Sequence, residues 1–346
     1  MVGLYRLAHR VVQVALSRDR GMKVLMLFLD GVGIGANKPS INPFFAAPMT
    51  SLRSLFDGRL PSLGQRALFS PQATLIPLDA RLGVAGLPQS GTGQTALFTG
   101  INGAAVAGRH FGPHPYSTLK PVIRERNIFR RLLDARKTPC FANAFPERFF
   151  DYLEQPRSRL TVTTLSCTSA GIPLFRAADL AAGRGVSADI TGAGWHALGY
   201  PDMATVTPAE AGRRLVRLTE DHDFVLFEYW RTDHAGHAMK MSEAVSVLDA
   251  LDGMLGGILE TMDVSTTMLL ITSDHGNIEN LSVKTHTRHP VPLVLYGLGH
   301  GEFAARVRNR SSRAPYLTAV TPALMDLIRG ELFVPEPMHV RRIQVH

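Results

Sequence analysis

Acidic residues and histidines stand in this sequence where runs of apolar residues end. Asp30 follows VLMLFL, Asp233 and His237 follow FVLFEY, and Asp274 and His275 follow MLLITS, with His286 eleven residues further on. Carboxylate oxygens and neutral imidazole nitrogens are the ligands that zinc and manganese prefer, and the ends of strands hold such side chains rigidly. The pattern predicts a metal centre.

The spacing within each motif favours a shared site. Asp233 and His237 are four residues apart, so a helical turn or a tight loop would present both to one ion. Asp274 and His275 are adjacent and share a site only if the strand ends there, as the following Gly-Asn pair indicates. Taken singly, each aspartate also reads as a helix N-cap and each histidine as an ordinary surface or core residue. Three such motifs after apolar runs favour the metal site.

A segment rich in small residues, GLPQSGTGQTALFTG, offers a nucleophile in Ser90 or Thr92. It reads as a loop that enters a helix, where backbone N–H groups and the positive helix end attract an anion. A metal ion can deprotonate a hydroxyl at such a position and so activate it. The alternative is an ordinary turn in which one of the two hydroxyls caps the helix.

The elements that must position these residues alternate between strands and helices. We expect strands at 24–29, 140–145, 224–229, 266–272 and 292–296, and helices at 49–56, 119–137, 208–220, 242–262 and 321–329. This order predicts an α/β fold with a mostly parallel sheet and helices on both faces. Metal ligands then fall at the carboxyl ends of strands, where such sheets place their sites.

Composition agrees with an intracellular enzyme that acts on a small anion. The net charge of +8 suits an anionic substrate, although arginine-rich tracts such as 306–313 read as solvated faces. Two cysteines, Cys140 and Cys167, are too few for a disulfide framework and indicate a reducing compartment, so we expect a cytoplasmic protein. We expect no transmembrane segment, because no apolar run is long enough, and no specific nucleic-acid partner.

The order and character of these motifs resemble the alkaline phosphatase superfamily, most closely its phosphomutase branch of cofactor-independent phosphoglycerate mutase and phosphopentomutase. The resemblance runs from about residue 22 to about residue 330 and rests on DGVGIGA, SGTG, DHAGH, TSDHGN and HTRHPVPLVLYG. It implies a three-layer alkaline-phosphatase-like domain with a small cap insertion and two divalent metal ions, Mn²⁺ or Zn²⁺.

The resemblance also implies roles for single residues. One ion would be held by Asp30, Asp274, His275 and the nucleophile, and the other by Asp233, His237 and His286. The nucleophile would be Ser90, which lies ten residues before Gly100, with Thr92 as the alternative. Mutases usually carry a histidine where this chain has Gln94.

Cationic residues near these motifs are candidate substrate contacts, namely Arg109, His110, Lys284 and Arg288. The expected domains are an N-terminal extension at 1–21, a core at 22–145 and 208–335, a reduced cap at 146–207 and a tail at 336–346. The basic extension reads as dispensable, with organellar targeting as the alternative.

Two divalent ions about 4 Å apart would clamp a phosphoryl group and lower the pKa of the serine hydroxyl. The short cap favours a phosphatase or phosphodiesterase that forms a phosphoserine intermediate at Ser90. One alternative is a phosphomutase, an isomerase of a glycerate or sugar phosphate, which must exclude water. The other is a non-catalytic, metal-stabilised binding protein. The sequence leaves the small phosphorylated substrate, the choice of metal and the oligomeric state open.

Overall fold

The computed structural model describes residues 21–311 and 314–330 of the chain. The expected tail at 336–346 and all but the last residue of the expected extension at 1–21 lie outside these ranges. The strands of the main sheet are β1 (Lys23–Leu29), β2 (Leu68–Phe69), β3 (Ala73–Leu78), β4 (Pro139–Phe141), β8 (Phe224–Tyr229), β9 (Thr267–Ser273) and β10 (Val291–Gly297). Their order in space is β2-β3-β10-β9-β1-β8-β4.

The central strands of this sheet are parallel. β1 pairs with β8 on one side and with β9 on the other, and β4 pairs in parallel with β8. β10 is antiparallel to both of its neighbours, β9 and β3, so an antiparallel portion extends the parallel one. The predicted α/β fold with a mostly parallel central sheet is confirmed.

Alternation along β1 explains why both faces of the sheet are covered. Val24, Met26 and Phe28 pack into one buried apolar cluster, and Leu25 and Leu27 pack into another. Successive side chains of a strand point to opposite faces, so an uninterrupted apolar strand needs a layer on each side. The run KVLMLFL therefore specifies a strand at the centre of three layers.

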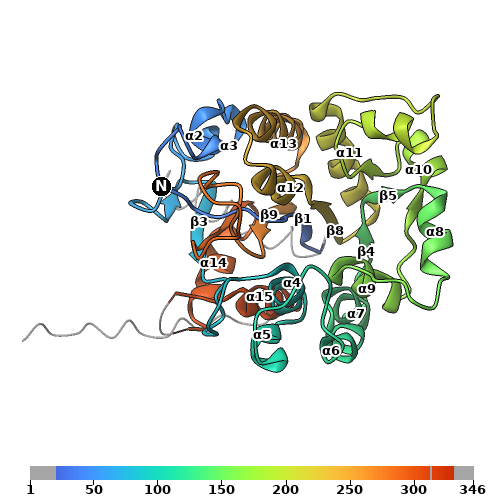
Figure 1. Cartoon of the computed structure of the whole chain (residues 1–346), viewed down its shortest axis with the longest axis horizontal. Helices are drawn as coiled ribbons and strands as arrows, with labels where there is room; N and C mark the ends of the chain where they lie inside the picture. Colours follow the sequence, from blue (N-terminus) through green and yellow to red (C-terminus); the bar gives the residue numbers. More distant parts are fainter. Residues whose placement is uncertain (1–20, 312–313, 331–346) are drawn as a thin grey trace, which may run out of the picture.

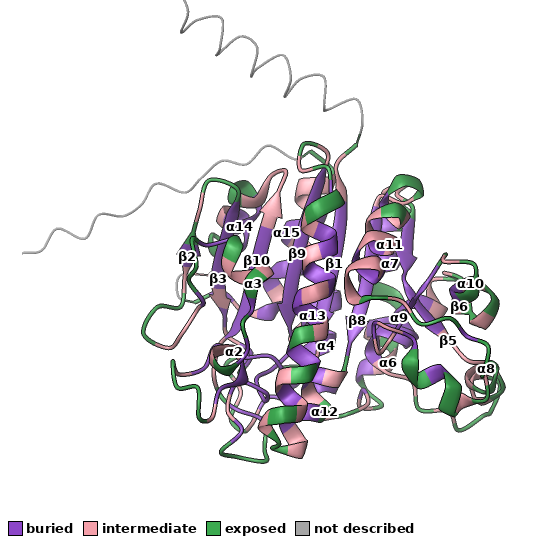
Figure 2. Ribbon diagram, turned by 90° about the horizontal axis from the view of Figure 1, so that it is seen from above, coloured by how far each residue is buried: buried purple, intermediate pink, exposed green. Residues whose placement is uncertain are grey.

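Helices form the two outer layers (Figure 1). One layer contains α2 (Pro43–Ala46), α3 (Thr50–Ser54), α11 (Pro208–Asp221), α12 (Arg231–Ala238) and α13 (Met241–Thr261). The other contains α4 (Ser90–Thr99), α5 (Gly103–Ala107), α6 (Leu119–Arg126), α7 (Ile128–Asp134), α14 (His300–Arg308) and α15 (Val320–Ile328), with the 3-10 turn η2 (Leu317–Ala319). Figure 2 shows the buried strands enclosed between these layers.

The region expected to be a reduced cap, 146–207, contains short elements. They are α8 (Glu147–Leu153), α9 (Val162–Ser169), β6 (Phe175–Arg176), α10 (Ala177–Ala181), β7 (Val186–Ser187) and the 3-10 turn η1 (Ala193–Leu198). β5 (Asn143–Phe145) joins β6 and β7 in a separate three-stranded sheet. Within this region α9 packs into the same apolar cluster as α4, through Val162 and Leu165. The division into core and cap stays a prediction.

Two expected elements are each split in the structure. The helix expected at 119–137 is two helices, because Asn127 ends α6 and caps α7 by accepting the N–H of Arg130. The strand expected at 140–145 is likewise two short strands in different sheets, β4 and β5. Among the helices of residues 21–311 and 314–330, none combines the length and apolar character that crossing a bilayer requires.

Candidate metal centre

Three neighbouring strands bring the acids and histidines to one edge of the sheet. β1, β8 and β9 are parallel, so their carboxyl ends meet at the same edge. Asp30 directly follows β1, Asp274 and His275 directly follow β9, and α12 begins two residues after β8. His286 comes from the loop before β10.

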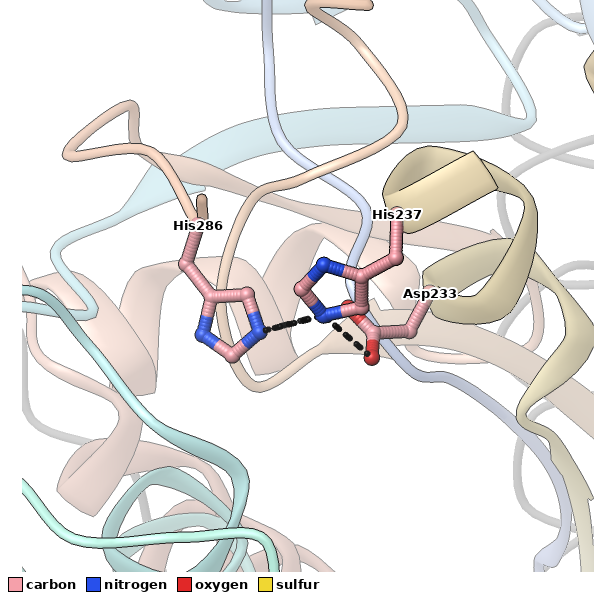
Figure 3. Close-up of side chains that lie close together, drawn as sticks. All are labelled: Asp233, His237 and His286. Atoms are coloured by element: carbon pink, nitrogen blue, oxygen red, sulfur yellow. Dashed lines mark hydrogen bonds and ion pairs between the residues drawn. The ribbon is translucent and has the colours of Figure 1, made fainter. Parts of the chain in front are cut away.

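His237, His286 and Asp233 point toward one another, as Figure 3 shows. The Nε2 atom of His237 lies 3.3 Å from Oδ2 of Asp233 and 3.2 Å from Nε2 of His286. The other carboxylate oxygen of Asp233 lies 3.5 Å from Nε2 of His286. Asp233 and His237 share one face of α12 because they are one helical turn apart.

The two imidazoles in this group turn their Nε2 atoms toward each other. Nδ1 of His237 lies 2.8 Å from the carbonyl oxygen of Lys284, and Nδ1 of His286 lies 2.8 Å from that of Pro88. A carbonyl oxygen only accepts, so each Nδ1 carries the hydrogen and each neutral ring has a lone pair on Nε2. Burial and the neighbouring His275 lower the pKa of His286 to about 4, which keeps that ring neutral.

When both rings are neutral, two lone pairs face each other here, and a metal ion between them would remove their repulsion. Two imidazole nitrogens that bind one tetrahedral zinc ion are about 3.3 Å apart, because each Zn–N bond is about 2.0–2.1 Å. The observed 3.2 Å between the Nε2 atoms of His237 and His286 agrees with that separation. These residues therefore fit a divalent metal ion.

A second group lies beside the first. Nε2 of His275 lies 3.3 Å from Oδ1 of Asp30 and 3.6 Å from Oδ2 of Asp274. Asp30, Asp233 and His275 each offer a ligand atom within 4.8 Å of the others. Asp233 therefore lies within reach of both groups, whereas the resemblance assigned it to one ion.

The second group concentrates negative charge. Burial, with the charge of Asp274 adding to it, raises the pKa of Asp30 well above its usual range. Burial by itself would lower the pKa of His275, but the charges of Asp274 and Asp30 raise it to about 10. The buried carboxylates of Asp30 and Asp274 destabilise each other when both are charged, and a bound cation would offset that repulsion.

The two candidate nucleophiles differ in what they contact. Ser90 is the first residue of α4, and its Oγ lies 3.0 Å from Nε2 of His275. The hydroxyl of Thr92 donates to the Gln89 carbonyl at 3.1 Å and accepts the Phe111 N–H at 3.3 Å. Ser90 thus faces the acids and histidines, whereas Thr92 holds the loop at Phe111 against the helix.

Gln94 links the two carboxylates of the second group. It is 2% exposed, and its Nε2 donates to Oδ2 of Asp274 at 3.0 Å and to Oδ2 of Asp30 at 3.4 Å. It lies one turn after Ser90 on α4, so both side chains project from the same helix face. Sequence reasoning noted Gln94 only as a departure from the mutases and did not give it this contact.

We expect the change Gln94→Ala to weaken metal binding by about 10–100-fold, because residues that orient metal ligands contribute that much to affinity. Calorimetric titration with Zn²⁺ and Mn²⁺ measures the change. Gln72→Ala is the matched control, since that side chain is exposed. Equal affinities in the Gln94 variant and the control would show that the two carboxylates hold their positions without the amide.

Asn277 and Glu279 also support the site, and sequence reasoning missed their roles. Nδ2 of Asn277 donates to Oδ1 of Asp233 at 2.7 Å. Glu279 is 1% exposed and accepts the N–H groups of Gly33 at 2.9 Å and of Asn277 at 2.7 Å. The available signal was the polar run GNIEN directly after a buried strand.

Two glycines allow backbone segments to approach the carboxylates. Gly31 has a φ of +72°, and a Cβ atom there would lie 2.5 Å from Oδ1 of Asp233. A Cβ atom at Gly93 would lie 2.7 Å from the carbonyl oxygen of Asp274. A larger residue at position 31 would push the end of β1 away from α12, and one at position 93 would push α4 away from the end of β9.

The side chains of the four predicted substrate contacts make other contacts than with the acids and histidines of the site. The guanidinium of Arg109 stacks on Phe111 at 5.6 Å, and Nε2 of His110 lies 3.1 Å from the Arg81 carbonyl. Lys284 contributes its backbone carbonyl to His237 (above), and Nε of Arg288 donates to the Gly86 carbonyl at 3.3 Å. Within the described residues, none of the four side chains bonds to the acids and histidines, so their substrate roles stay predictions.

Residues 200–331 match the family model of the metalloenzyme superfamily. This segment is similar to proteins of that superfamily. The segment contains five of the acids and histidines that gather at the sheet edge, namely Asp233, His237, Asp274, His275 and His286.

Curated proteins similar to this chain include 2,3-bisphosphoglycerate-independent phosphoglycerate mutases. That of Pyrococcus abyssi is 32% identical over 128 residues, which are 35% of this chain and 31% of the relative. That of Desulforudis audaxviator is 30% identical over 115 residues, which are 32% of this chain and 21% of the relative. The chain thus spans less than a third of these relatives' length.

A solved structure supports the fold over nearly the whole chain. The PH0037 protein from Pyrococcus horikoshii aligns with a TM-score of 0.51 and 15% identity, covering 91% of this chain and 99% of that one. The resemblance to phosphoglycerate mutases that the sequence predicts is confirmed, and the match to the metalloenzyme superfamily agrees with it.

Proposed function

We propose that this chain is a two-metal phosphoryl-transfer enzyme that hydrolyses phosphate esters through Ser90. The observation that carries the proposal is the pair of facing Nε2 atoms on His237 and His286, whose Nδ1 atoms are both occupied by backbone carbonyls. One ion would be held by these histidines with Asp233, and the other by Asp30, Asp274, His275 and Ser90. The choice between Mn²⁺ and Zn²⁺ stays open, because carboxylates and imidazoles suit both.

Divalent ions at these positions would polarise the phosphoryl oxygens and lower the pKa of the serine hydroxyl. Ser90 then attacks phosphorus through Oγ, and the bond from phosphorus to the alcohol oxygen breaks. The alcohol leaves with the proton that Ser90 has lost. Water attacks the phosphoserine, releasing phosphate and restoring the hydroxyl.

Hydrolysis is preferred over intramolecular transfer because the site is open to water. The side chain of His237 is 41% exposed and that of Asp233 is 19% exposed. A mutase must hold its substrate while water is excluded, which requires a closed cover. The short segment 146–207 offers less material for such a cover than a large inserted domain would.

The alternative is a phosphomutase, and the names of the curated relatives favour it. In that reaction the phosphoserine is attacked by another hydroxyl of the retained substrate, so phosphate is never released. The two reactions share Ser90 and both metal groups. They differ only in the fate of the phosphoserine.

Activity on a generic aryl phosphate tests the proposal. Protein freed of metal and then supplied with Mn²⁺ or Zn²⁺ is expected to release phosphate from phenyl phosphate, and protein kept in chelator is not. The same preparation is then given 3-phosphoglycerate and a sugar phosphate, with product analysis by NMR. Isomerised product without free phosphate would favour the mutase, and no turnover of any substrate with either metal would contradict both reactions.

A further inference from the structure

A cleft of about 540 Å³ lies beside α12, on the side of the small sheet. Its walls come from β5 and the residues after it, from β7, from η1 and from the first turn of α12. Figure 1 shows that α12 follows β8, which lies next to β4 in the main sheet. The chain continues from β4 into β5 of the small sheet. The volume falls within the roughly 300–1,000 Å³ of pockets that bind drug-sized ligands. A three-carbon phosphate would leave most of it filled with water.

Trp230 offers an aromatic face in this cleft. Its side chain is 47% exposed, which is unusual for so large an apolar ring. Trp195 also lines the cleft, but it is 3% exposed and its Nε1 donates to Oγ of Ser187 at 2.8 Å. Trp195 therefore builds the wall, and Trp230 is the tryptophan that a ligand can cover.

Two arginines in the cleft have no anionic partner among the residues that the structure describes. Within residues 21–311 and 314–330, the side chains of Arg148 and Arg231 make neither an ion pair nor a hydrogen bond. Of the acids that line the cleft, Asp189 accepts backbone N–H groups at the start of η1, and Glu243 lies 3.8 Å from His234, which lines the cleft as well. Guanidinium groups in a largely apolar cleft favour a ligand that carries a carboxylate or a phosphate.

α12 connects the cleft to the metal centre. Trp230 and His234 lie one helical turn apart along the cleft, and Asp233 and His237 lie one turn apart along the metal groups. Residues three apart on a helix are neighbours, so these two rows adjoin each other. If the phosphoryl group of an ester were held beside Asp233, its alcohol part would lie near Trp230.

We propose that this cleft binds the alcohol part of the phosphate ester, and that this part is a ring bearing a second anionic group. The inference rests on the function proposed above and narrows its substrate class. Trp230 stacks on the ring, and Arg148 and Arg231 pair with the second anion. A phosphorylated three-carbon acid has the anion but lacks the ring.

Fluorescence measures this binding without turnover, because the sequence contains only two tryptophans. Zn²⁺-loaded Trp195→Phe protein, in which Trp230 is the sole tryptophan, is titrated with three phosphonates that cannot be hydrolysed. We expect 4-carboxybenzylphosphonate to bind about tenfold more tightly than benzylphosphonate, which lacks the second anion, and than 3-phosphonopropionate, which lacks the ring. In Trp230→Phe protein the emission change should vanish.

Variants separate the two contributions. By calorimetry, we expect Trp230→Ala to remove the preference for a ring. The double variant Arg148→Gln, Arg231→Gln is expected to remove the preference for the second carboxylate. Phe69→Ala and Arg66→Ala are matched exposed controls that should change neither preference. Thermal melts show that each variant is folded.

The outcomes distinguish this inference from the proposed function. Equal affinities for the three phosphonates, or preferences that survive in the variants, would overturn the cleft assignment even if phenyl phosphate is hydrolysed. If the preferences appear but no phosphate ester is turned over, the cleft assignment holds and the proposed reaction is wrong.

Discussion

Replacing Ser90 by alanine is expected to abolish turnover, lowering kcat by roughly 10⁴-fold or more, because the attacking oxygen is gone. The fold should persist, since Ser90 begins α4 and alanine is a good helix former. Most metal binding should persist as well, because six other acids and histidines remain. Steady-state kinetics on phenyl phosphate measures the loss, and metal content measures what is kept.

Thr92→Ala is the matched control for that experiment. Its hydroxyl holds the loop at Phe111, so its loss should cost on the order of 1 kcal/mol of folding stability and leave kcat within a few-fold. Peptide mass spectrometry after trapping with substrate should find phosphate on Ser90. Phosphate on Thr92, or undiminished activity in Ser90→Ala, would show that the nucleophile is misassigned.

Replacing His286 by alanine is expected to remove about one of two bound divalent ions per chain. Only Asp233 would then remain beside Nε2 of His237. The affinity for the metal ion at this position should therefore fall by more than the 10–100-fold that is typical when a residue hydrogen-bonded to a metal ligand is replaced. Native mass spectrometry after gentle desalting measures the stoichiometry. A metal ion present at 100 times its Kd raises the free energy of unfolding by about 2.7 kcal/mol, and this increase should be smaller in the variant.

His234→Ala serves as the control for metal content. His234 projects from the same helix as His237, but its side chain is 72% exposed and faces the cleft. Two ions per chain are expected in this variant, as in the unaltered protein. Two ions per chain in His286→Ala as well would contradict the ligand assignment.

The sequence predicted the strands best where they are buried on both faces. The strand expected at 224–229 has the bounds of β8, because FVLFEY combines aromatic and β-branched residues without interruption. β3 was not predicted, because Pro77 lies inside its apolar run and proline is uncommon in the interior of a strand. It pairs with β10 alongside another proline, Pro292. Pairing across the sheet overrides the local signal there.

Helix packing was less accessible from sequence. The arginine-rich tract 306–313 reads as a solvated face, yet Arg306 belongs to α14, is 6% exposed and pairs with Glu302 at 2.7 Å. The prediction of a wholly solvated tract is therefore wrong at Arg306. Charge alone does not tell whether a neighbour one turn away neutralises an arginine and allows its burial.

Part of the candidate site was visible in the sequence, because its acids and histidines follow apolar runs. The parts that orient them were not. The carbonyl of Pro88 fixes the tautomer of His286, although 198 residues separate the two, and no local pattern marks such a contact. Gln94 was likewise recognisable as an exception but not as a link between Asp30 and Asp274.

The position of β1 has a consequence for how this chain is made. β1 ends at Leu29, and its neighbours β8 and β9 begin only at Phe224 and Thr267. At about 5–20 residues per second, a ribosome needs roughly 10–40 s to reach the first of them. During that interval KVLMLFL has neither neighbour, and an unpaired apolar strand is a template for aggregation. β1, which lies between β8 and β9 in the folded sheet, is therefore the strand that we expect a chaperone to protect during synthesis.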